Sequence, residues 1–232
     1  MSAPIVITDI EGTTSSLSFV KQVLFPYAAQ HLSDYVQRHI ETSKVQDQLA
    51  AASEISGIPL TDTAALVQQL LSWIAADKKV TPLKALQGMI WESGYETGAY
   101  QAHLYQDAER HLKLWRKQGV GIYVYSSGSI YAQKLFFQYS EFGDLRSLFS
   151  GHFDTTTGVK SQSSSYRAIA DLIGQPVQAM HFLSDVEAEL DAARDAGMNT
   201  VRLVREEDYG IEPAEADSTH LCVASFDDIP DL

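Results

Sequence analysis

Short apolar runs rich in β-branched residues recur along the chain, and longer helical patterns separate them. The runs lie at residues 4–8, 120–125, 179–184 and 199–204, with a weaker one near 148–153. Runs this short that are apolar throughout are typical of parallel strands buried on both faces of a sheet. Strands that alternate with helices predict an α/β fold, here with a doubly wound parallel sheet as its core.

Helical patterns fill the gaps between the later runs. Residues 107–118 have Asp107 as the expected N-cap and Gly119 after the last helical residue. Two further helices are expected over 129–140, which follows a serine, and over 187–196. These helices would cover the two faces of the sheet.

Residues 17–104 interrupt the alternation with several helical patterns in succession. They are expected at about 26–40, 45–56 and 61–76, with a fourth opening at "TPLKALQGMIW". In that fourth pattern Thr81 and Pro82 form a typical cap and first turn. We therefore predict a catalytic core of residues 1–16 and 105–232 with an inserted all-helical cap domain, residues 17–104.

The charge of the chain restricts its partners. Seventeen Lys and Arg residues against thirty Asp and Glu give a net charge of −13, and no basic run could follow a polynucleotide or an anionic membrane.

The opening "SAPIVITDIE" has no basic segment of the kind that begins a signal peptide, so we expect a cytoplasmic protein. The single cysteine, Cys222, excludes an internal disulfide, and its apolar surroundings favour a buried position on a strand.

Two acids follow the first apolar run, in the segment "IVITDIEGTTSS". Asp9 and Glu11 are two residues apart, so they point in the same direction from the carboxyl end of the strand. Ligands of open α/β sheets bind at that edge. Taken alone, the pair could also be solvated acids in a loop.

Polar residues follow the second run, and a lysine precedes a later helix. Ser126 and Ser127 stand where a strand meets a helix N-terminus, so they could bind an anion or only cap the helix. Lys160 lies in a polar loop, where most lysines are solvated. Asp185 follows the fourth run, and the acids after it could simply favour the helix dipole.

Taken together, these residues indicate metal-assisted phosphoryl transfer. Carboxylates from different strand ends suit Mg²⁺, which also takes phosphate oxygens as ligands. Asp9 could then attack phosphorus, Lys160 and Ser126 could stabilise the phosphoryl oxygens, and Glu11 could act as acid and base.

Other classes of site lack their motifs. The seven histidines have no H-E-x-x-H spacing that would indicate a zinc site. No G-x-S-x-G elbow surrounds Ser126, and no G-x-G-x-x-G follows the first run, which argues against a serine hydrolase and a dinucleotide-binding fold.

The order of these motifs resembles that of the haloacid dehalogenase superfamily of phosphatases. Longer strings resemble its enolase-phosphatase (acireductone synthase) family of methionine salvage: "DIEGTT", "LQGMIWESGY", "YSSGSIYAQKLFF", "GDL" and "FDTTTGVK". Glu11 is the sharpest pointer, because most relatives carry aspartate at that position. The resemblance spans essentially the whole chain, and it implies that the parallel sheet is a Rossmann-like core of the haloacid dehalogenase type.

The resemblance implies a reaction and a role for each site residue. The substrate would be 2,3-diketo-5-methylthiopentyl-1-phosphate, enolised and then dephosphorylated through an aspartyl-phosphate to 1,2-dihydroxy-3-keto-5-methylthiopentene. One Mg²⁺ per subunit and a monomer are expected. The roles would be Asp9 as nucleophile, Glu11 as acid and base, Ser126, Ser127 and Lys160 as phosphate contacts, and Asp9, the Glu11 carbonyl and Asp185 as metal ligands.

The base of the enolisation step stays open at this stage. Glu11 is one methylene longer than aspartate and could serve both half-reactions, while Glu92 in the expected cap is a rival base. Gln87, Trp91 and Glu92 are the expected substrate-facing cap residues, although apolar neighbours in the same string suit core packing.

Two other functions remain possible from the sequence. One is a general small-molecule phosphatase of the same superfamily. The other is a phospho-accepting signalling domain similar to a response-regulator receiver, although receivers place the acceptor on the third strand and lack a cap.

Overall fold

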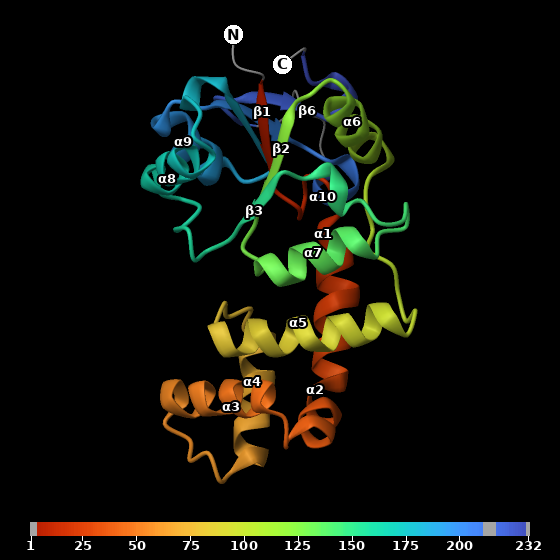
Figure 1. The fold of residues 1–232 in the computed structure, drawn as a ribbon, viewed down its shortest axis with the longest axis vertical. Coiled ribbons are helices and arrows are strands. Elements are labelled where there is room, and N and C mark those ends of the chain that lie inside the picture. Colours follow the sequence, from red (N-terminus) through yellow and green to blue (C-terminus); the bar gives the residue numbers. More distant parts are fainter. Residues whose placement is uncertain (1–3, 211–216, 231–232) are drawn as a thin grey trace. The chain divides into compact units, whose positions relative to one another are not determined.

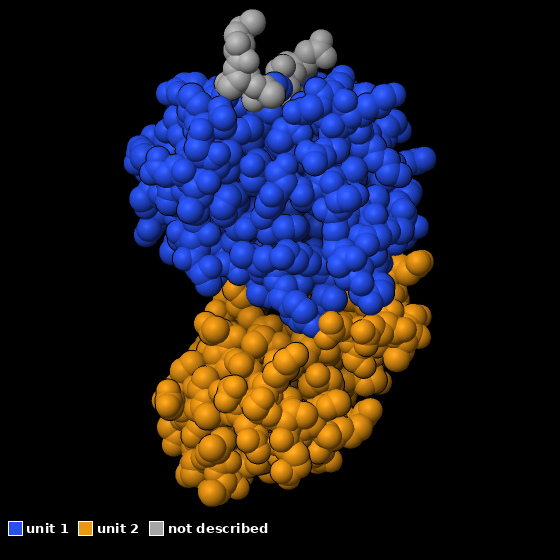
Figure 2. All heavy atoms as spheres, in the orientation of Figure 1, with its two compact units in different colours: residues 1–19, 102–232 blue, residues 20–101 orange. Residues whose placement is uncertain are grey.

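The computed structural model describes residues 4–210 and 217–230 (Figure 1). The chain divides into two compact units, drawn in different colours in Figure 2. The first combines Met1–Phe19 with Ala102–Leu232, and the second is Val20–Gln101. The first three residues of the expected core segment lie outside the described part.

The first unit is built on a parallel sheet, which has six strands within the described residues. They are β1 (Ile5–Thr8), β2 (Gly121–Tyr125), β3 (Gly151–Phe153), β4 (Met180–Ser184), β5 (Asn199–Leu203) and β6 (Leu221–Val223). Their spatial order is β3-β2-β1-β4-β5-β6, so β1 lies between β2 and β4. Together with the helical second unit, this confirms the predicted fold class.

Helices cover the sheet because parallel strands all start at the same edge. After each strand the chain must therefore cross a face of the sheet to reach the start of the next one. They are α1 (Leu17–Phe19), α6 (Gln106–Lys117), α7 (Ile130–Gln138), α8 (Ser163–Ile173), α9 (Glu187–Ala196) and α10 (Glu206–Tyr209). The short 3₁₀ turns are η2 (Arg146–Leu148) before β3, η3 (Val177–Ala179) before β4 and η5 (Phe226–Asp228) after β6. In Figure 1, α8 and α9 lie on one side of the sheet and α6 on the other. Fully buried side chains between the sheet and α8 and α9, such as Phe182 and Tyr166, form the core there.

The second unit consists of helices around its own apolar core. Its elements are the π-helical turn η1 (Val20–Leu24), α2 (Phe25–His39), α3 (Ser43–Ser56), α4 (Thr63–Ala75) and α5 (Thr81–Glu96). All four predicted helices are confirmed. Leucines with almost no exposure, including Leu32, Leu49 and Leu70, fill the space between them. Full burial of a large apolar side chain stabilises the fold by about 1.5–3 kcal/mol, so these side chains give the second unit an apolar core of its own.

Hydrogen bonds within the first unit join the chain segments on either side of residues 20–101. The amide of Ser16 donates to Nδ1 of His103 at 3.1 Å, and the amide of Tyr105 donates to the carbonyl of Thr14 at 2.9 Å. The chain therefore leaves and re-enters the sheet-bearing unit at neighbouring points.

Two predicted helix caps are wrong. Tyr105, not Asp107, precedes the first residue of α6, and Asp107 lies in the first turn. The Asp107 carboxylate is instead bound by Arg205 and by the amide of Phe226, both at 2.7 Å. Thr81 is likewise the first residue of α5, after Val80, and makes no capping hydrogen bond.

Cys222 lies on β6 as expected, but its side chain is only half-buried because β6 is the edge strand of the sheet. No helix among residues 4–210 and 217–230 is both long enough and apolar enough to cross a membrane.

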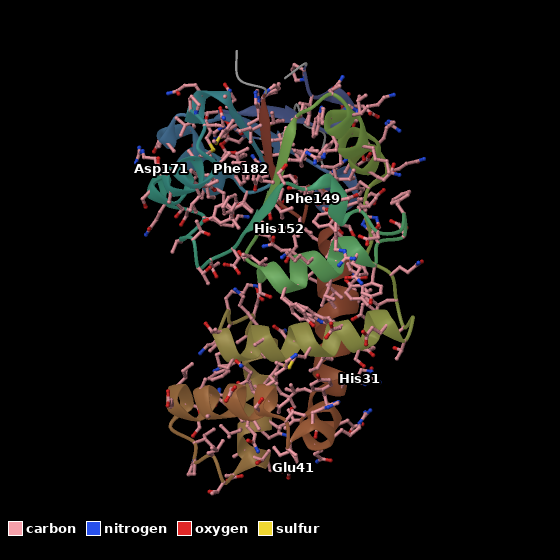
Figure 3. All side chains as sticks on the ribbon, viewed as in Figure 1. His31, Glu41, Phe149, His152, Asp171 and Phe182 are labelled. Carbon is pink, nitrogen blue, oxygen red and sulfur yellow. The ribbon has the colours of Figure 1, made fainter. Side chains whose placement is uncertain are left out.

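His152 on β3 is held as a neutral ring. It packs beside Phe149, with 5.6 Å between ring centroids (Figure 3). The Gln133 side-chain nitrogen donates to the carbonyls of Gly128 and Phe153, so its oxygen accepts from His152 Nδ1 at 3.2 Å. Burial, and then the charge of Lys134, lower the pKa of His152 from 6.5 to about 4.

This depressed pKa predicts a loss of stability in acid. The unfolded chain binds a proton at His152 below about pH 6.5, but the folded chain binds it only near pH 4, so the stabilisation is present above pH 6.5 and is lost as the pH falls. After allowance for partial exposure of the ring, the loss is about 2 kcal/mol. Urea unfolding of wild type and His152→Gln at pH 7 and pH 4 measures it. A stability difference between the two proteins that does not change with pH would contradict this account.

Candidate active site

Asp9 comes directly after β1 and is almost completely buried. Its amide continues the sheet by donating to the carbonyl of Leu183 at 2.9 Å. One carboxylate oxygen accepts from the amide of Ile10 at 2.7 Å, and the other accepts from Lys160 Nζ at 2.6 Å. Backbone and lysine together fix the orientation of this carboxylate at the carboxyl edge of the sheet.

Lys160 is a buried cation rather than a solvated surface lysine. Its side chain is only 6% exposed, and Nζ lies 2.6 Å from Asp9 and 2.5 Å from Glu189. The phenol of Tyr166 donates to its carbonyl at 2.7 Å, which holds the loop in place. Burial alone would lower the pKa of Lys160, but the charges of Asp9 and Glu189 and their hydrogen bonds raise it above its usual value. The lysine is therefore charged at neutral pH.

Glu189 is a site residue that sequence reasoning missed. Its position in the first turn of α9 suggested only a favourable interaction with the helix dipole. In the structure it contacts Lys160, and it also accepts from the hydroxyl of Ser184 at 3.2 Å. Burial, followed by the charge of Asp9, raises the pKa of Glu189, and Lys160 opposes that shift. No sequence pattern points to this contact, because an acid at a helix start already has a local explanation.

Asp185 comes directly after β4, next to the loop that follows β1. One carboxylate oxygen, Oδ2, accepts from the phenol of Tyr209 at 2.6 Å. The other, Oδ1, is buried and has no hydrogen-bond partner among the described residues. Burial, and after it the charge of Asp9, raise the pKa of Asp185 to about 6.

These features fit a hard divalent cation. A buried carboxylate oxygen without a partner is costly, and a second carboxylate nearby adds repulsion. Oxygen donors from Asp9 and Asp185 are the type that Mg²⁺ prefers. The residues present therefore suit such an ion at the end of the sheet.

Gly12 allows the loop after β1 to approach Asp185 closely. It has a φ of +67°, and a Cβ added to it would lie 2.2 Å from Asp185 Oδ2. Glycine is favoured at this position for two reasons, its left-handed backbone and the absence of a side chain.

Replacing Gly12 by Ala is expected to disrupt the site. The left-handed backbone costs about 1–2 kcal/mol for alanine, and the new methyl group displaces the Asp185 carboxylate. We expect phosphate release to fall at least about 100-fold, because misplacement by about 1 Å has effects of that size. Gly57→Ala is the matched control: its φ is +74°, but an added Cβ meets no described atom within 4 Å. Equal losses of activity in both variants, in assays of phosphate release, would show that backbone strain alone is responsible.

The two predicted serines lie in the loop between β2 and α7. Ser126 is 4% exposed, and its hydroxyl accepts from the amide of Gly128 at 3.3 Å. Ser127 is half-buried. Ser129, not either of these, caps α7 by accepting from the amide of Ala132. The capping alternative for Ser126 and Ser127 is therefore wrong.

Glu11 follows Asp9 in the same loop and is partly exposed, unlike its buried neighbour. Its backbone pairs with Ser15 in an isolated bridge. A carboxylate with access to solvent can exchange protons, which suits the acid and base role predicted for it.

The three expected cap residues belong to α5 in the second unit. Gln87 is 6% exposed, and Glu92 is half-buried. The indole of Trp91 donates to the carbonyl of Leu24 at 2.8 Å and stacks on Phe25, with 6.3 Å between ring centroids. Trp91 therefore takes part in packing within its own unit.

A second group of possible metal ligands is already satisfied by protein. Ligand atoms of Glu187, Asp191 and His220 lie within 4.8 Å of one another. Arg202 binds Glu187 at 3.0 Å, and Arg194 binds Asp191 at 2.5 Å. These arginines supply the positive charge that the carboxylates need.

Comparison with known proteins identifies the family. No family model matches the chain. The chain is 54% identical over 229 residues to an enolase-phosphatase E1 of Pseudomonas aeruginosa (strain LESB58), and the comparison covers 99% of each sequence. Among solved structures, the UTR4 protein (Unknown transcript 4 protein) of Saccharomyces cerevisiae is 33% identical with a TM-score of 0.80, covering 98% of this chain and 100% of that one.

A more distant structure shows the fold alone. The L-2-haloacid dehalogenase RSc1362 is 16% identical with a TM-score of 0.54, covering 96% of this chain and 94% of that one. The predicted haloacid dehalogenase type of sheet with a helical insertion is thereby confirmed. Given the identity over almost its full length, the chain belongs to the enolase-phosphatase E1 family of enzymes.

Proposed function

We propose that the chain enolises 2,3-diketo-5-methylthiopentyl-1-phosphate and then removes its phosphate, giving 1,2-dihydroxy-3-keto-5-methylthiopentene in methionine salvage. The observation that carries this proposal is the buried group of Asp9, Lys160 and Glu189 beside Asp185. It combines an oriented carboxylate, a cation and a carboxylate oxygen without a protein partner.

Phosphoryl transfer would begin at Asp9. A carboxylate oxygen of Asp9 forms a bond to phosphorus while the bond from phosphorus to the substrate oxygen breaks, and Glu11 gives a proton to that leaving oxygen. The ammonium of Lys160, 2.6 Å from Asp9, stabilises the negative charge on the phosphoryl oxygens. Ser126 and Ser127 would donate hydrogen bonds to the same oxygens.

Hydrolysis of the aspartyl-phosphate would restore the enzyme. Glu11, now a carboxylate, takes a proton from a water molecule, and the water oxygen attacks phosphorus. The bond between phosphorus and Asp9 breaks, and inorganic phosphate leaves. The partial exposure of Glu11 is consistent with access of that water.

One Mg²⁺ would be held by Asp9, Asp185 and the backbone carbonyl of Glu11. When bound, it supplies positive charge that offsets the repulsion between these carboxylates and the substrate phosphate. The buried Oδ1 of Asp185, which has no protein partner among the described residues, supports this assignment.

Enolisation would precede phosphate removal. A carboxylate base removes a proton from the carbon that bears the phosphate, a double bond forms to the neighbouring carbon, and the carbonyl oxygen there takes up a proton. Glu11 is our candidate for this base, because it already exchanges protons in the second half-reaction. Glu92 on α5 is the rival.

We also propose a role for the helical insertion, a cellular location and an oligomeric state. Residues 17–104 would act as a cap domain inserted into the catalytic core formed by residues 1–16 and 105–232. The protein would act as a cytoplasmic monomer on a small phosphorylated substrate, with no nucleic acid or membrane partner, as its net charge of −13 suggests.

The decisive test follows both products in one reaction. Purified protein and Mg²⁺ are incubated anaerobically with the diketone phosphate, while enol absorbance and free phosphate are recorded together. An enol that appears before phosphate supports the proposal. Release of phosphate from many unrelated esters without an enol would instead indicate a general phosphatase.

Two variants would then separate the candidate bases. We expect Glu11→Asp to slow both enol formation and phosphate release, and Glu92→Gln to leave both largely unchanged. If Glu92→Gln removes enolisation while sparing phosphate release from the enol, Glu92 is the base and the dual role of Glu11 is wrong.

A further inference from the structure

The segment that follows β5 holds three separate parts of the first unit. Arg205 donates to the carbonyl of Thr13 through two nitrogens, at 2.8 and 3.2 Å. Asp208 accepts from the amide of Leu17 at 2.9 Å. Tyr209 donates to Asp185 Oδ2 at 2.6 Å. Arg205 and the short turn α10 that follows it thus reach the loop after β1, the start of α1 and the carboxylate after β4.

Arg205 fixes this turn to the core. The guanidinium is buried, with its central carbon 4.1 Å from the ring centroid of Tyr105 and 5.4 Å from that of Phe226. It also pairs with Asp107 at 2.7 Å. Because α10 is held in this way, Tyr209 is presented to Asp185 in a defined position and does not depend on a flexible loop.

The environment of Asp185 makes its two oxygens different. Oδ2 receives the Tyr209 hydrogen bond and lies against the backbone of Gly12, where an added Cβ would come within 2.2 Å. Oδ1 is buried and has no partner among the described residues. The side chain is therefore held with one oxygen occupied by protein and the other left available.

We propose that Tyr209 is a positioning residue that directs Asp185 Oδ1 toward the cation, an inference that rests on the proposed Mg²⁺-dependent function. The hydrogen bond to Oδ2 holds the carboxylate in one rotamer and makes it a ligand through a single oxygen. Without the phenol, Asp185 would lose the side-chain hydrogen bond that fixes its carboxylate, and binding of the ion would have to order it. Partners of metal ligands commonly affect metal affinity by about 10–100-fold when they are removed.

The test compares Tyr209→Phe with Tyr105→Phe by calorimetric titration with Mg²⁺, without substrate. Tyr105 also donates its phenol to a carboxylate of the same turn, that of Asp208 at 3.0 Å, but it does not touch Asp185. We expect about a tenfold weaker Mg²⁺ affinity in Tyr209→Phe and a change of less than about twofold in Tyr105→Phe. Asp185→Asn identifies the heat that comes from this site.

A kinetic measurement supports the titration. In Tyr209→Phe the Mg²⁺ concentration for half-maximal phosphate release should rise by the same factor as the dissociation constant, with kcat at saturating Mg²⁺ near that of wild type. A general loss of structure would lower kcat instead.

Two results would overturn the inference. One is a wild-type Mg²⁺ affinity in Tyr209→Phe; the other is an equal loss in both variants, which would mean that docking of α10 matters and the Tyr209 contact does not. Either result leaves Mg²⁺-dependent phosphate release by the wild type intact. Failure of the proposed function would appear separately, as a wild type that neither binds Mg²⁺ nor needs it.

Discussion

Asp9→Asn is expected to lower the rate of phosphate release by more than about 10⁴-fold, because the amide cannot form the bond to phosphorus. The new side chain has the same shape and keeps an oxygen for Lys160, but its NH2 group replaces the acceptor of the Ile10 amide, so we expect a folded protein of somewhat lower stability. Since enolisation uses a different residue, the enol phosphate should accumulate while free phosphate does not appear. Single-turnover measurements of enol absorbance and phosphate test both expectations.

The Asp9→Asn result would discriminate between two mechanisms. Residual phosphate release at about one per cent of the wild-type rate would indicate direct attack by water rather than by Asp9. Circular dichroism and the urea midpoint of the variant provide the control for folding.

Lys160→Met is expected to cost about 3–5 kcal/mol of stability, because it leaves the buried carboxylates of Asp9 and Glu189 without their cation. Methionine fills a similar volume, so a cavity contributes little. The rate of phosphate release should also fall by about 10²–10³-fold through loss of charge stabilisation. Urea unfolding and phosphate release measure the two effects. Lys79→Met is the matched control: its pair with Asp77 is exposed and is worth about 0–1 kcal/mol.

A second substitution tests the cause of that instability. Adding Glu189→Gln to Lys160→Met removes one of the two uncompensated charges, so part of the stability should return while activity stays low. With wild type and Glu189→Gln alone, the two proteins complete a double-mutant cycle that isolates the coupling of Lys160 to Glu189. A double variant as unstable as Lys160→Met alone would show that charge is not the reason.

The strands of the sheet were predictable because their apolar runs are continuous. The run near 148–153 was longer than β3, since Leu148 belongs to the turn η2 and residues 149–150 connect that turn to the strand. The helical turns at 17–24 and 206–209 were missed, because elements this short are stabilised by tertiary contacts rather than by a periodic pattern. Asp107 failed as a predicted cap for a similar reason: a buried partner, Arg205, lies 98 residues away in sequence.

The site was predictable where residues follow strands directly. Asp9 and Asp185 could be paired from the parallel sheet alone, and membership of the enolase-phosphatase E1 family confirms the function class that the motifs indicated. Glu189 has a sufficient local explanation as a helix-start acid, so nothing pointed to its contact with Lys160. Tyr209 follows no pattern, and only the tertiary structure brings it to Asp185. The roles assigned to the individual residues stay predictions.

The side-by-side exit and return of the chain at Ser16 and His103 has a consequence during protein synthesis. The ribosome adds about 5–20 residues per second, so β1 leaves the exit tunnel several seconds before its partner strand β2. Residues 20–101 pack around a core of their own and can fold in that interval. Their early folding would shorten the effective loop between β1 and β2, which lowers the entropy lost when the central strand finally pairs. Nascent chains stalled at a length that places residues 20–101, but not β2, outside the exit tunnel should therefore already resist proteolysis within residues 20–101.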